Sequence, residues 1–367
     1  MQKRRIRMIS AAVAVAIPLG TTVCGAVAAP SAQAQTVNAS PSGVRPGDAA
    51  PVIKPVVGVN LYIKDNYSLA DVTTWGERDL QFIRHTLGLK AVAIDWDYNV
   101  PSDGSDVVAS SPTRTPTIAD LTELTKLAKS DGLRVEYRAL FAINNLDSRD
   151  RSLVPKHLGA WLDSLLSTET PALELAQREH VSEFVVGTEM AAVDQSPLWG
   201  GFFKRAAKIY KGTLSYASWG GRASADGSGF FDSHRVDLPV AALGATAYPP
   251  IDLLRDASVD ALTKAWEHWL SAYTPASVLR RTAIDEVGIP ALGGSYYDPW
   301  QWDGLKGKAD PIVQARWFQA ACAAVTAEHM RGIYFWSESL NDNPAKPFDS
   351  LVGFLGRPAS LAAIRSC

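Results

Sequence analysis

The chain has 367 residues, 47% hydrophobic and 20% charged, so it can bury a sizeable core and is not disordered throughout. Its 36 Lys and Arg nearly balance 38 Asp and Glu, and the net charge of −2 argues against a nucleic-acid-binding protein, which needs a basic face. The 11 Trp are many for one chain, and surplus Trp either packs in the core or offers flat platforms to ligands such as sugar rings.

The first 34 residues are predicted to be a signal peptide that is removed on export. Basic residues gather near the N-terminus, an Ala- and Val-rich apolar run spans 9–29, and small residues at 31–34 suit cleavage before Gln35. A membrane anchor is the alternative, which Pro18 and the small-residue ending disfavour. We therefore expect a secreted protein with a flexible leader at 35–51 and no membrane contact, because no later stretch is long and apolar enough to span a bilayer.

From residue 52 to residue 367, strand-like and helix-like segments alternate. Strands are predicted at Val56–Ile63, Ala91–Asp97, Leu133–Phe141, Glu183–Glu189, Leu214–Trp219, Ala241–Tyr248, Arg281–Val287 and Gly332–Trp336. Helices are predicted at Leu69–Leu87, Ile118–Lys129, His157–His180, Leu198–Tyr210, Ser258–Tyr273, Pro311–His329 and Pro358–Ile364. After the fifth strand a polar loop runs through Phe231, where a helix would be expected.

This order of elements indicates an α/β fold. Repeated strand–helix units without an internal linker predict a single (β/α)8 TIM barrel over residues 52–367. An open doubly wound sheet is the alternative. An all-β sandwich is disfavoured, because the chain has no array of short alternating strands.

The cysteines and the known short motifs narrow the chemistry. Cys24 would leave with the signal peptide, and the remaining Cys322 and Cys367 either form a disulfide or stay as free thiols. The chain has no zinc-type Cys/His spacing and no HExxH, GxSxG, GxGxxG or P-loop motif. We therefore expect neither a metal nor an organic cofactor, and a serine hydrolase, a dinucleotide enzyme and an NTPase are all disfavoured.

Two glutamates stand where a TIM barrel performs its chemistry, at the carboxyl ends of the strands. Glu189 ends the predicted fourth strand and Glu286 lies near the end of the seventh, so both can reach one cleft across the barrel mouth. Two facing carboxylates are what glycosidic cleavage needs, one as nucleophile and one as acid and base. The alternative is that each Glu caps a helix or pairs with an Arg.

Aromatic residues occupy several of the other strand ends. Tyr248 follows the sixth strand and can direct its hydroxyl toward Glu286. Trp336 ends the eighth strand, and Trp96 and Trp219 lie on the second and fifth, so all three are candidate sugar platforms. Trp300 and Trp302 lie in the loop after the seventh strand and are candidates for lining an outer subsite.

Two acids flank Trp96 on the second strand. Asp95 or Asp97 would hold substrate hydroxyls, or would form an ion pair with a neighbouring Arg. Both interpretations remain open at this point.

Taken together, these residues resemble clan A of the glycoside hydrolases, which are retaining (β/α)8 enzymes, and most closely family 113, known for β-1,4-mannanase activity. The matching segments are Phe184–Met190, Tyr210–Trp219, Leu243–Pro250, Ile284–Gly288 and Gly332–Trp336. The resemblance runs from about Gly58 to Pro358, and the order and spacing of the segments carry it rather than any one motif.

The resemblance implies a role for each matching residue. Glu189 would be the acid/base and Glu286 the nucleophile. Tyr248 would hydrogen-bond the nucleophile, and Trp336 would stack under the sugar at the point of cleavage. Arg138 stands where the family has a basic residue, so we include it among the substrate-binding candidates.

Three positions depart from the pattern of the clan or the family. Thr188 precedes the acid/base, where many clan A enzymes have Asn. Asp285 precedes the nucleophile in place of an expected Thr, and strand alternation should turn it away from the cleft. Leu140 stands at a His-like position and removes an expected sugar contact, which affects mannan specificity more than the chemistry.

The sequence therefore predicts a secreted, monomeric, retaining β-glycoside hydrolase that acts on a polysaccharide or oligosaccharide, with β-1,4-mannan as the leading substrate. The two rivals are the same chemistry on another β-linked glycan and a barrel that binds sugar without cleaving it. For a retaining enzyme, the Glu189 and Glu286 carboxyl groups should lie about 5–5.5 Å apart.

Overall fold

The computed structural model describes residues 54–144, 153–220, 242–272, 274–302, 304–346 and 350–367. One compact unit spans Pro51–Cys367. The predicted signal peptide, the leader and most of the polar loop through Phe231 lie outside the described residues, so those predictions stay predictions.

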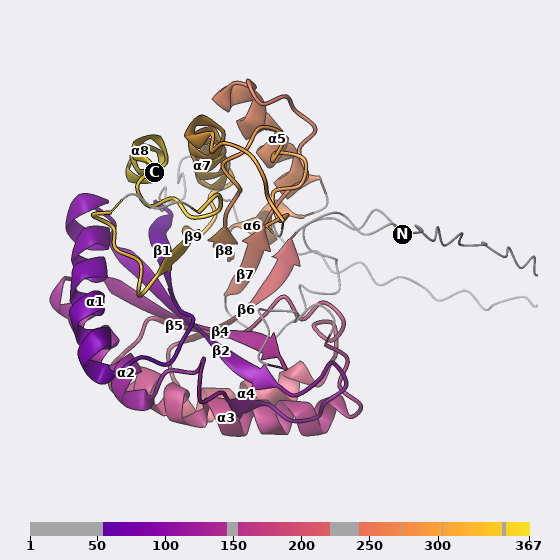
Figure 1. The fold of residues 1–367 in the computed structure, drawn as a ribbon. Helices are drawn as coiled ribbons and strands as arrows, with labels where there is room; N and C mark the ends of the chain where they lie inside the picture. The colour runs from indigo at the N-terminus through magenta and orange to yellow at the C-terminus, as the bar shows by residue number, and fades with distance from the viewer. Residues whose placement is uncertain (1–53, 145–152, 221–241, 273, 303, 347–349) are drawn as a thin grey trace, which may run out of the picture. The chain divides into compact units, whose positions relative to one another are not determined.

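Eight parallel strands of the described chain form a closed barrel, as predicted (Figure 1). They are β1 (Val56–Ile63), β2 (Ala91–Val100), β4 (Arg134–Ile143), β5 (Glu183–Thr188), β6 (Thr213–Gly220), β7 (Leu243–Ala247), β8 (Thr282–Val287) and β9 (Gly332–Ser339). The strands follow one another in chain order around the ring, and the pairing of β1 with β2 closes it. A two-residue strand, β3 (Ala109–Ser110), pairs antiparallel with the end of β2 and was not predicted.

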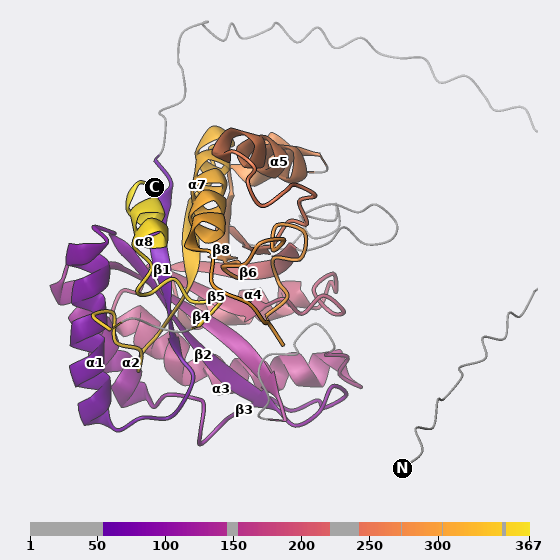
Figure 2. The same cartoon turned by 45° about the horizontal axis from the view of Figure 1, so that its top comes forward.

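Helices connect the strands and surround the barrel. The described helices are α1 (Leu69–Gln81), followed by a π-helical turn (Phe82–Thr86), α2 (Ile118–Ser130), α3 (Leu158–Arg178), α4 (Trp199–Ile209), α5 (Val259–Ser271), α6 (Ala276–Leu279), α7 (Pro311–Ala327) and α8 (Pro358–Arg365). Side chains of Ser68, Thr117 and Ser258 cap the first turns of α1, α2 and α5, which explains where these helices begin. Figure 2 shows α5, α7 and α8 together on one side of the barrel. None of the helices in the described ranges has the length and hydropathy needed to cross a bilayer.

The barrel strands alternate between an apolar outer face and an unusually polar inner face. Val92, Ile94 and Trp96 of β2 belong to the main core between the strands and the helices. Asp95 belongs to the opposite face and is fully buried within the barrel. Period-2 alternation thus decides which residues of each strand can approach the site.

The interior of the barrel holds several buried acids beneath the mouth. Burial and neighbouring carboxylates raise the pKa of Glu136 and of Asp285 well above the usual range. Gly244 is required here, because a Cβ at this position would lie 1.8 Å from Oδ2 of Asp285. Glu183 is paired with Arg331 at the amino end of the strands. Asp285 is fully buried beside Gly244, and the expected alternation of Asp285 with Glu286 does not hold, because the register of β8 shifts after Ile284.

Cys322 of α7 and Cys367 form a disulfide, which settles the alternative that the sequence left open. The bond fastens the C-terminus, just after α8, to α7 and closes a loop with a sequence separation of 45. Replacing both cysteines with Ser is expected to lower the free energy of unfolding by up to about 4 kcal/mol, since the unfolded chain gains loop entropy. Denaturant titration measures this, and wild-type protein in a reductant should unfold at the same midpoint as the variant. Equal midpoints for oxidised wild type and the variant would contradict the expected contribution.

Glu338 near the end of β9 makes stability depend on pH. Burial and the charge of Asp79 raise the pKa of Glu338 well above its usual value, so the folded protein holds a proton that the unfolded chain releases above about pH 4.5. The stability that this proton contributes is present at low pH and is lost as the pH rises toward the folded-state pKa. Glu338→Gln should therefore gain stability relative to wild type by about 1.4 kcal/mol per pH unit in this window. Thermal unfolding between about pH 5 and pH 8 measures the trend, and the exposed Glu174→Gln should run parallel to wild type. A constant difference between Glu338→Gln and wild type would refute it.

Candidate active site

Glu189 leaves the end of β5 in an unusual backbone conformation. Its φ is 57°, a left-handed value that residues with a side chain seldom adopt. The Glu189 N–H donates to the carbonyl of Ala217 on β6 at 2.8 Å, which holds the turn in place. Such outliers gather at functional sites, and the half-buried Glu189 lies at the barrel mouth.

Glu286 reaches the mouth because β8 carries a bulge. The register between β7 and β8 slips by one residue, so Ala245 is opposite Ile284 while Thr246 is opposite Glu286. The side chains of two successive residues, Asp285 and Glu286, therefore both lie away from the outer, helix-facing side of β8. Asp285 is 0% exposed and Glu286 is 7% exposed, which gives only Glu286 access to the mouth.

Two hydrogen-bond donors hold the Glu286 carboxylate. Arg138 Nη2 donates to Oε2 at 2.8 Å, and the Tyr248 hydroxyl donates to Oε1. Burial, followed by the charges of Glu286 and Glu189, raises the pKa of Tyr248 well above its ordinary value, so Tyr248 stays protonated. The Tyr248–Glu286 bond that the sequence predicted is confirmed.

Arg138 and Asp95 lie below the cleft rather than facing a substrate. Arg138 is fully buried and bridges Asp95 and Glu286, at 2.8 Å to each, and Asn60 Nδ2 donates to Asp95 Oδ2 at 2.9 Å. Burial raises the pKa of Asp95 to about 7 even though Arg138 lowers it. The expectation that Asp95 and Arg138 bind substrate is thus corrected: Asp95 makes the ion pair that was its alternative, and Arg138 positions the Glu286 carboxylate.

Aromatic rings form a continuous floor along the mouth. Trp336 stacks with Trp302 at 6.2 Å between centroids and contacts Tyr62 at 5.3 Å, and the Arg138 guanidinium lies 5.1 Å from the Trp336 ring centroid. Tyr248 links Trp302 to Trp219, with centroid distances of 5.7 and 5.8 Å. Trp336 and Trp219 are half-buried, as a platform for a sugar requires.

Trp96 is not part of this floor. It is 0% exposed and packs its ring edge to face against Tyr98, Tyr137 and Phe184 in the layer between strands and helices. The prediction of a cleft platform at Trp96 is wrong, because alternation along β2 turns this residue outward while Asp95 turns inward.

Sequence reasoning missed Tyr62 and Asn60, both on β1. The Tyr62 hydroxyl donates to Asp97 Oδ2 at 2.6 Å, and Arg114 Nη1 donates to the same oxygen at 3.0 Å. Asp97 therefore anchors the mouth-facing side of β1 and the segment before α2. Both residues could have been found in the sequence, because Asn60 and Tyr62 are the polar and aromatic exceptions in an otherwise apolar β1.

Two of the departures noted in the sequence have a structural explanation. The Thr188 hydroxyl donates to the Ala139 carbonyl at 3.1 Å, so it braces β5 against β4 and does not face the cleft. Leu140 lies on the same face of β4 as Arg138, is 5% exposed and lies outside the main apolar core. An apolar side chain therefore stands beside Asp97, its partner in the strand register.

Removing the Tyr248 hydroxyl should slow the reaction without weakening binding. Tyr248→Phe is expected to lower kcat by about 10- to 100-fold with a small change in KM, because a hydrogen bond to a charged group is lost at the carboxylate. Tyr296→Phe is the matched control, since that buried hydroxyl donates to the Val313 carbonyl. Equal kcat in both variants would show that the Tyr248 hydroxyl does not contribute to catalysis.

No group of His, Cys, Asp and Glu suited to a metal ion occurs among the described residues. The arrangement they do form is a Glu286 carboxylate held by Arg138 and Tyr248, a half-buried Glu189 at the end of β5 and a row of aromatic rings, which suits nucleophilic and acid–base chemistry on a sugar.

Comparisons with known proteins bear on this arrangement. Residues 73–348 match Glycoside Hydrolase Family 113. No significant match was found among curated proteins.

Solved structures share the fold. A family 113 β-1,4-mannanase is 19% identical, with a TM-score of 0.68 over 85% of this chain and 98% of its own. The family 113 β-mannanase of Alicyclobacillus acidocaldarius is also 19% identical, with a TM-score of 0.64 over 85% of this chain and 97% of its own. A family 5 protein from Streptomyces cattleya, solved with Manβ1-4GlcNAc, is 12% identical, with a TM-score of 0.53 over 85% of this chain and 79% of its own.

Proposed function

Because the chain belongs to glycoside hydrolase family 113, it is a glycoside hydrolase, and we propose that it is a secreted, retaining enzyme that cleaves a β-1,4-mannan-like glycan. In this proposal Glu286 attacks the anomeric carbon, and Glu189 protonates the leaving oxygen and later deprotonates water. The product then keeps the β configuration of the substrate.

One observation carries the assignment of roles. The Glu286 carboxylate accepts hydrogen bonds from Arg138 and Tyr248, both buried and both fixed. Two donors hold the carboxylate in one orientation, as a nucleophile requires. Glu189 has one side open to the mouth, which suits a group that exchanges protons with substrate and water.

The choice of mannan rests on likeness. The family 113 proteins of similar fold are described as β-1,4-mannanase and β-mannanase. Leu140 beside Asp97 is the residue that favours a different β-linked glycan with the same chemistry, because it offers no hydrogen bond to a sugar hydroxyl. Secretion rests on the N-terminal sequence pattern alone.

Sugar release by the purified protein lacking residues 1–34 from a panel of β-linked glycans tests the substrate. We expect β-1,4-mannan to be cleaved, with β-configured product seen first by proton NMR. Cleavage of another glycan with retention would keep the mechanism and discard mannan, whereas an α-configured first product would refute the two-step mechanism.

A further inference from the structure

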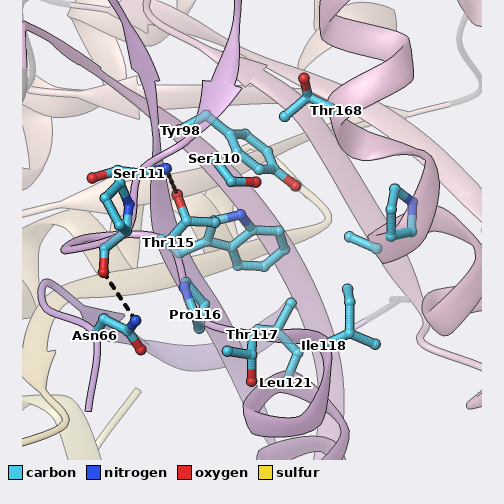
Figure 3. Close-up of a pocket in the computed structure, with 14 residues that line it drawn as sticks. Asn66, Tyr98, Ser110, Ser111, Thr115, Pro116, Thr117, Ile118, Leu121 and Thr168 are labelled. Carbon is cyan, nitrogen blue, oxygen red and sulfur yellow. Dashed lines mark hydrogen bonds between the residues drawn. The ribbon is translucent and has the colours of Figure 1, made fainter.

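A pocket outside the barrel mouth lies between the end of β2, the start of α2 and α3 (Figure 3). Its volume is about 440 Å³, within the range of small-molecule sites. The buried Trp96 and Tyr98 of β2 belong to its lining, and neither Glu189 nor Glu286 is among the described residues that line it. The pocket is therefore separate from the catalytic cleft.

The lining of the pocket selects for a neutral ligand. None of the described lining residues carries a charge, so nothing in them would balance a phosphate, a carboxylate or a cation. Prolyl and aliphatic side chains line it together with hydroxyl groups and one amide, while the rings of Trp96 and Tyr98 are 0% and 2% exposed. An amphipathic molecule with an apolar face and a polar edge matches such a wall, as a sugar ring does.

Several polar side chains of the lining already donate hydrogen bonds within the protein. Thr168 Oγ1 donates to the Val108 carbonyl at 2.8 Å, and Thr117 Oγ1 donates to Asp120 Oδ2 at 2.7 Å. Asn66 Nδ2 donates to the Pro112 carbonyl at 2.9 Å, as Figure 3 shows. Thr117 Oγ1 also accepts from the Asp120 N–H at 3.2 Å, so one lone pair remains on this oxygen. The free lone pairs of the two Thr oxygens accept hydrogen bonds from ligand hydroxyls.

One residue connects this pocket with the mouth. Thr115, which lines the pocket, donates its hydroxyl to the Asp97 carbonyl at 2.6 Å. The neighbouring Arg114 donates to the Asp97 side chain, which also accepts from Tyr62. The end of β2 thus borders both the pocket and the contacts of Arg114 and Tyr62 with Asp97 at the mouth.

We propose that this pocket is a second carbohydrate-binding site, which holds one or two sugar units of the glycan whose chain is cut at the barrel mouth. The inference rests on the proposed function, since it takes the same glycan as its ligand. Binding at two places on one polymer raises the effective concentration of the chain at the cleft without any new catalytic contact.

Filling the pocket tests the proposal. Ile118→Trp and, independently, Ser110→Trp place a large side chain at its rim, where Ile118 is 37% exposed. Ala119→Trp, an exposed neighbour on α2 outside the lining, is the matched control. Each is made in the Glu286→Gln background for binding of β-1,4-mannotetraose and in the active enzyme for hydrolysis.

Two readouts are expected to agree. Mannotetraose should slow amide hydrogen exchange in residues 109–118 of the control and leave both pocket variants unchanged. In the active enzyme, the pocket variants should raise KM for polymeric mannan about threefold or more at constant kcat. Hydrolysis of mannotetraose itself should match the control.

Each other result identifies which claim fails. If the control cleaves mannan but mannotetraose leaves exchange at 109–118 unchanged, or if the pocket variants bind and cleave as the control does, the second site is refuted and the proposed function stands. If the exchange slows while no variant cleaves mannan, the pocket binds sugar and the proposed substrate is wrong. If neither occurs, both proposals fail.

Discussion

Glu286→Gln is expected to lower kcat on the natural glycan by on the order of 10⁴-fold or more, because the covalent step loses its nucleophile. Gln keeps the shape of the side chain, and the fully buried Arg138 keeps its ion pair with Asp95. The variant should therefore fold, and circular dichroism and thermal unfolding verify this. Glu136→Gln is the matched control, since Glu136 is another buried Glu on a barrel strand, and its pKa is also raised by burial.

Azide distinguishes a lost nucleophile from general damage. In Glu286→Ala, azide occupies the space of the carboxylate and should attack an activated β-glycoside to give an α-glycosyl azide. Recovery of that product would assign Glu286 directly. Undiminished hydrolysis by Glu286→Gln would remove this residue from the mechanism.

Glu189→Ala should show a loss of rate that depends on the leaving group. On a natural glycan the loss is expected to be about 10²- to 10⁴-fold, because the leaving oxygen needs a proton. Aryl glycosides with acidic leaving groups need none, so their first step should be nearly unaffected. Added azide should now give a β-glycosyl azide, the opposite configuration to that from Glu286→Ala.

A comparison of several leaving groups measures this dependence. Rates that fall equally for acidic and poor leaving groups would contradict an acid/base role for Glu189. The alternative in which the two glutamates exchange roles predicts the reverse pair of azide products.

The barrel could be predicted because each strand–helix unit carries local sequence signals for its own secondary structure. β-Branched strands such as Val56–Ile63 alternate with helices that begin at capping residues such as Thr117, which caps α2 in the structure. The helix predicted over Leu69–Leu87 ends instead at Gln81 and continues as a π-helical turn. The short β3 and α6 lack enough residues to produce a periodic signal.

Site residues could be predicted where their position along a strand alone decides whether they lie at the barrel mouth. Glu189, Glu286 and Tyr248 follow from the rule that barrel chemistry sits at strand ends. Trp96 was misplaced, because that rule was applied without the alternation that turns neighbours to opposite faces. Asp95 does lie inward, but it is fully buried in an ion pair with Arg138. The contact of Arg138 with Glu286 depends on the bulge in β8, and no local pattern in Thr282–Val287 announces that bulge.

The most direct test of the central claim is to trap the glycosyl-enzyme intermediate. The protein is incubated with an activated 2-deoxy-2-fluoro β-glycoside of the sugar that it cleaves, digested, and sequenced by mass spectrometry. We predict one added sugar per chain, attached to the carboxyl group of Glu286. A label on Glu189 or on any other residue would contradict the assignment, and an unlabelled chain that releases α-configured sugar would contradict retention itself.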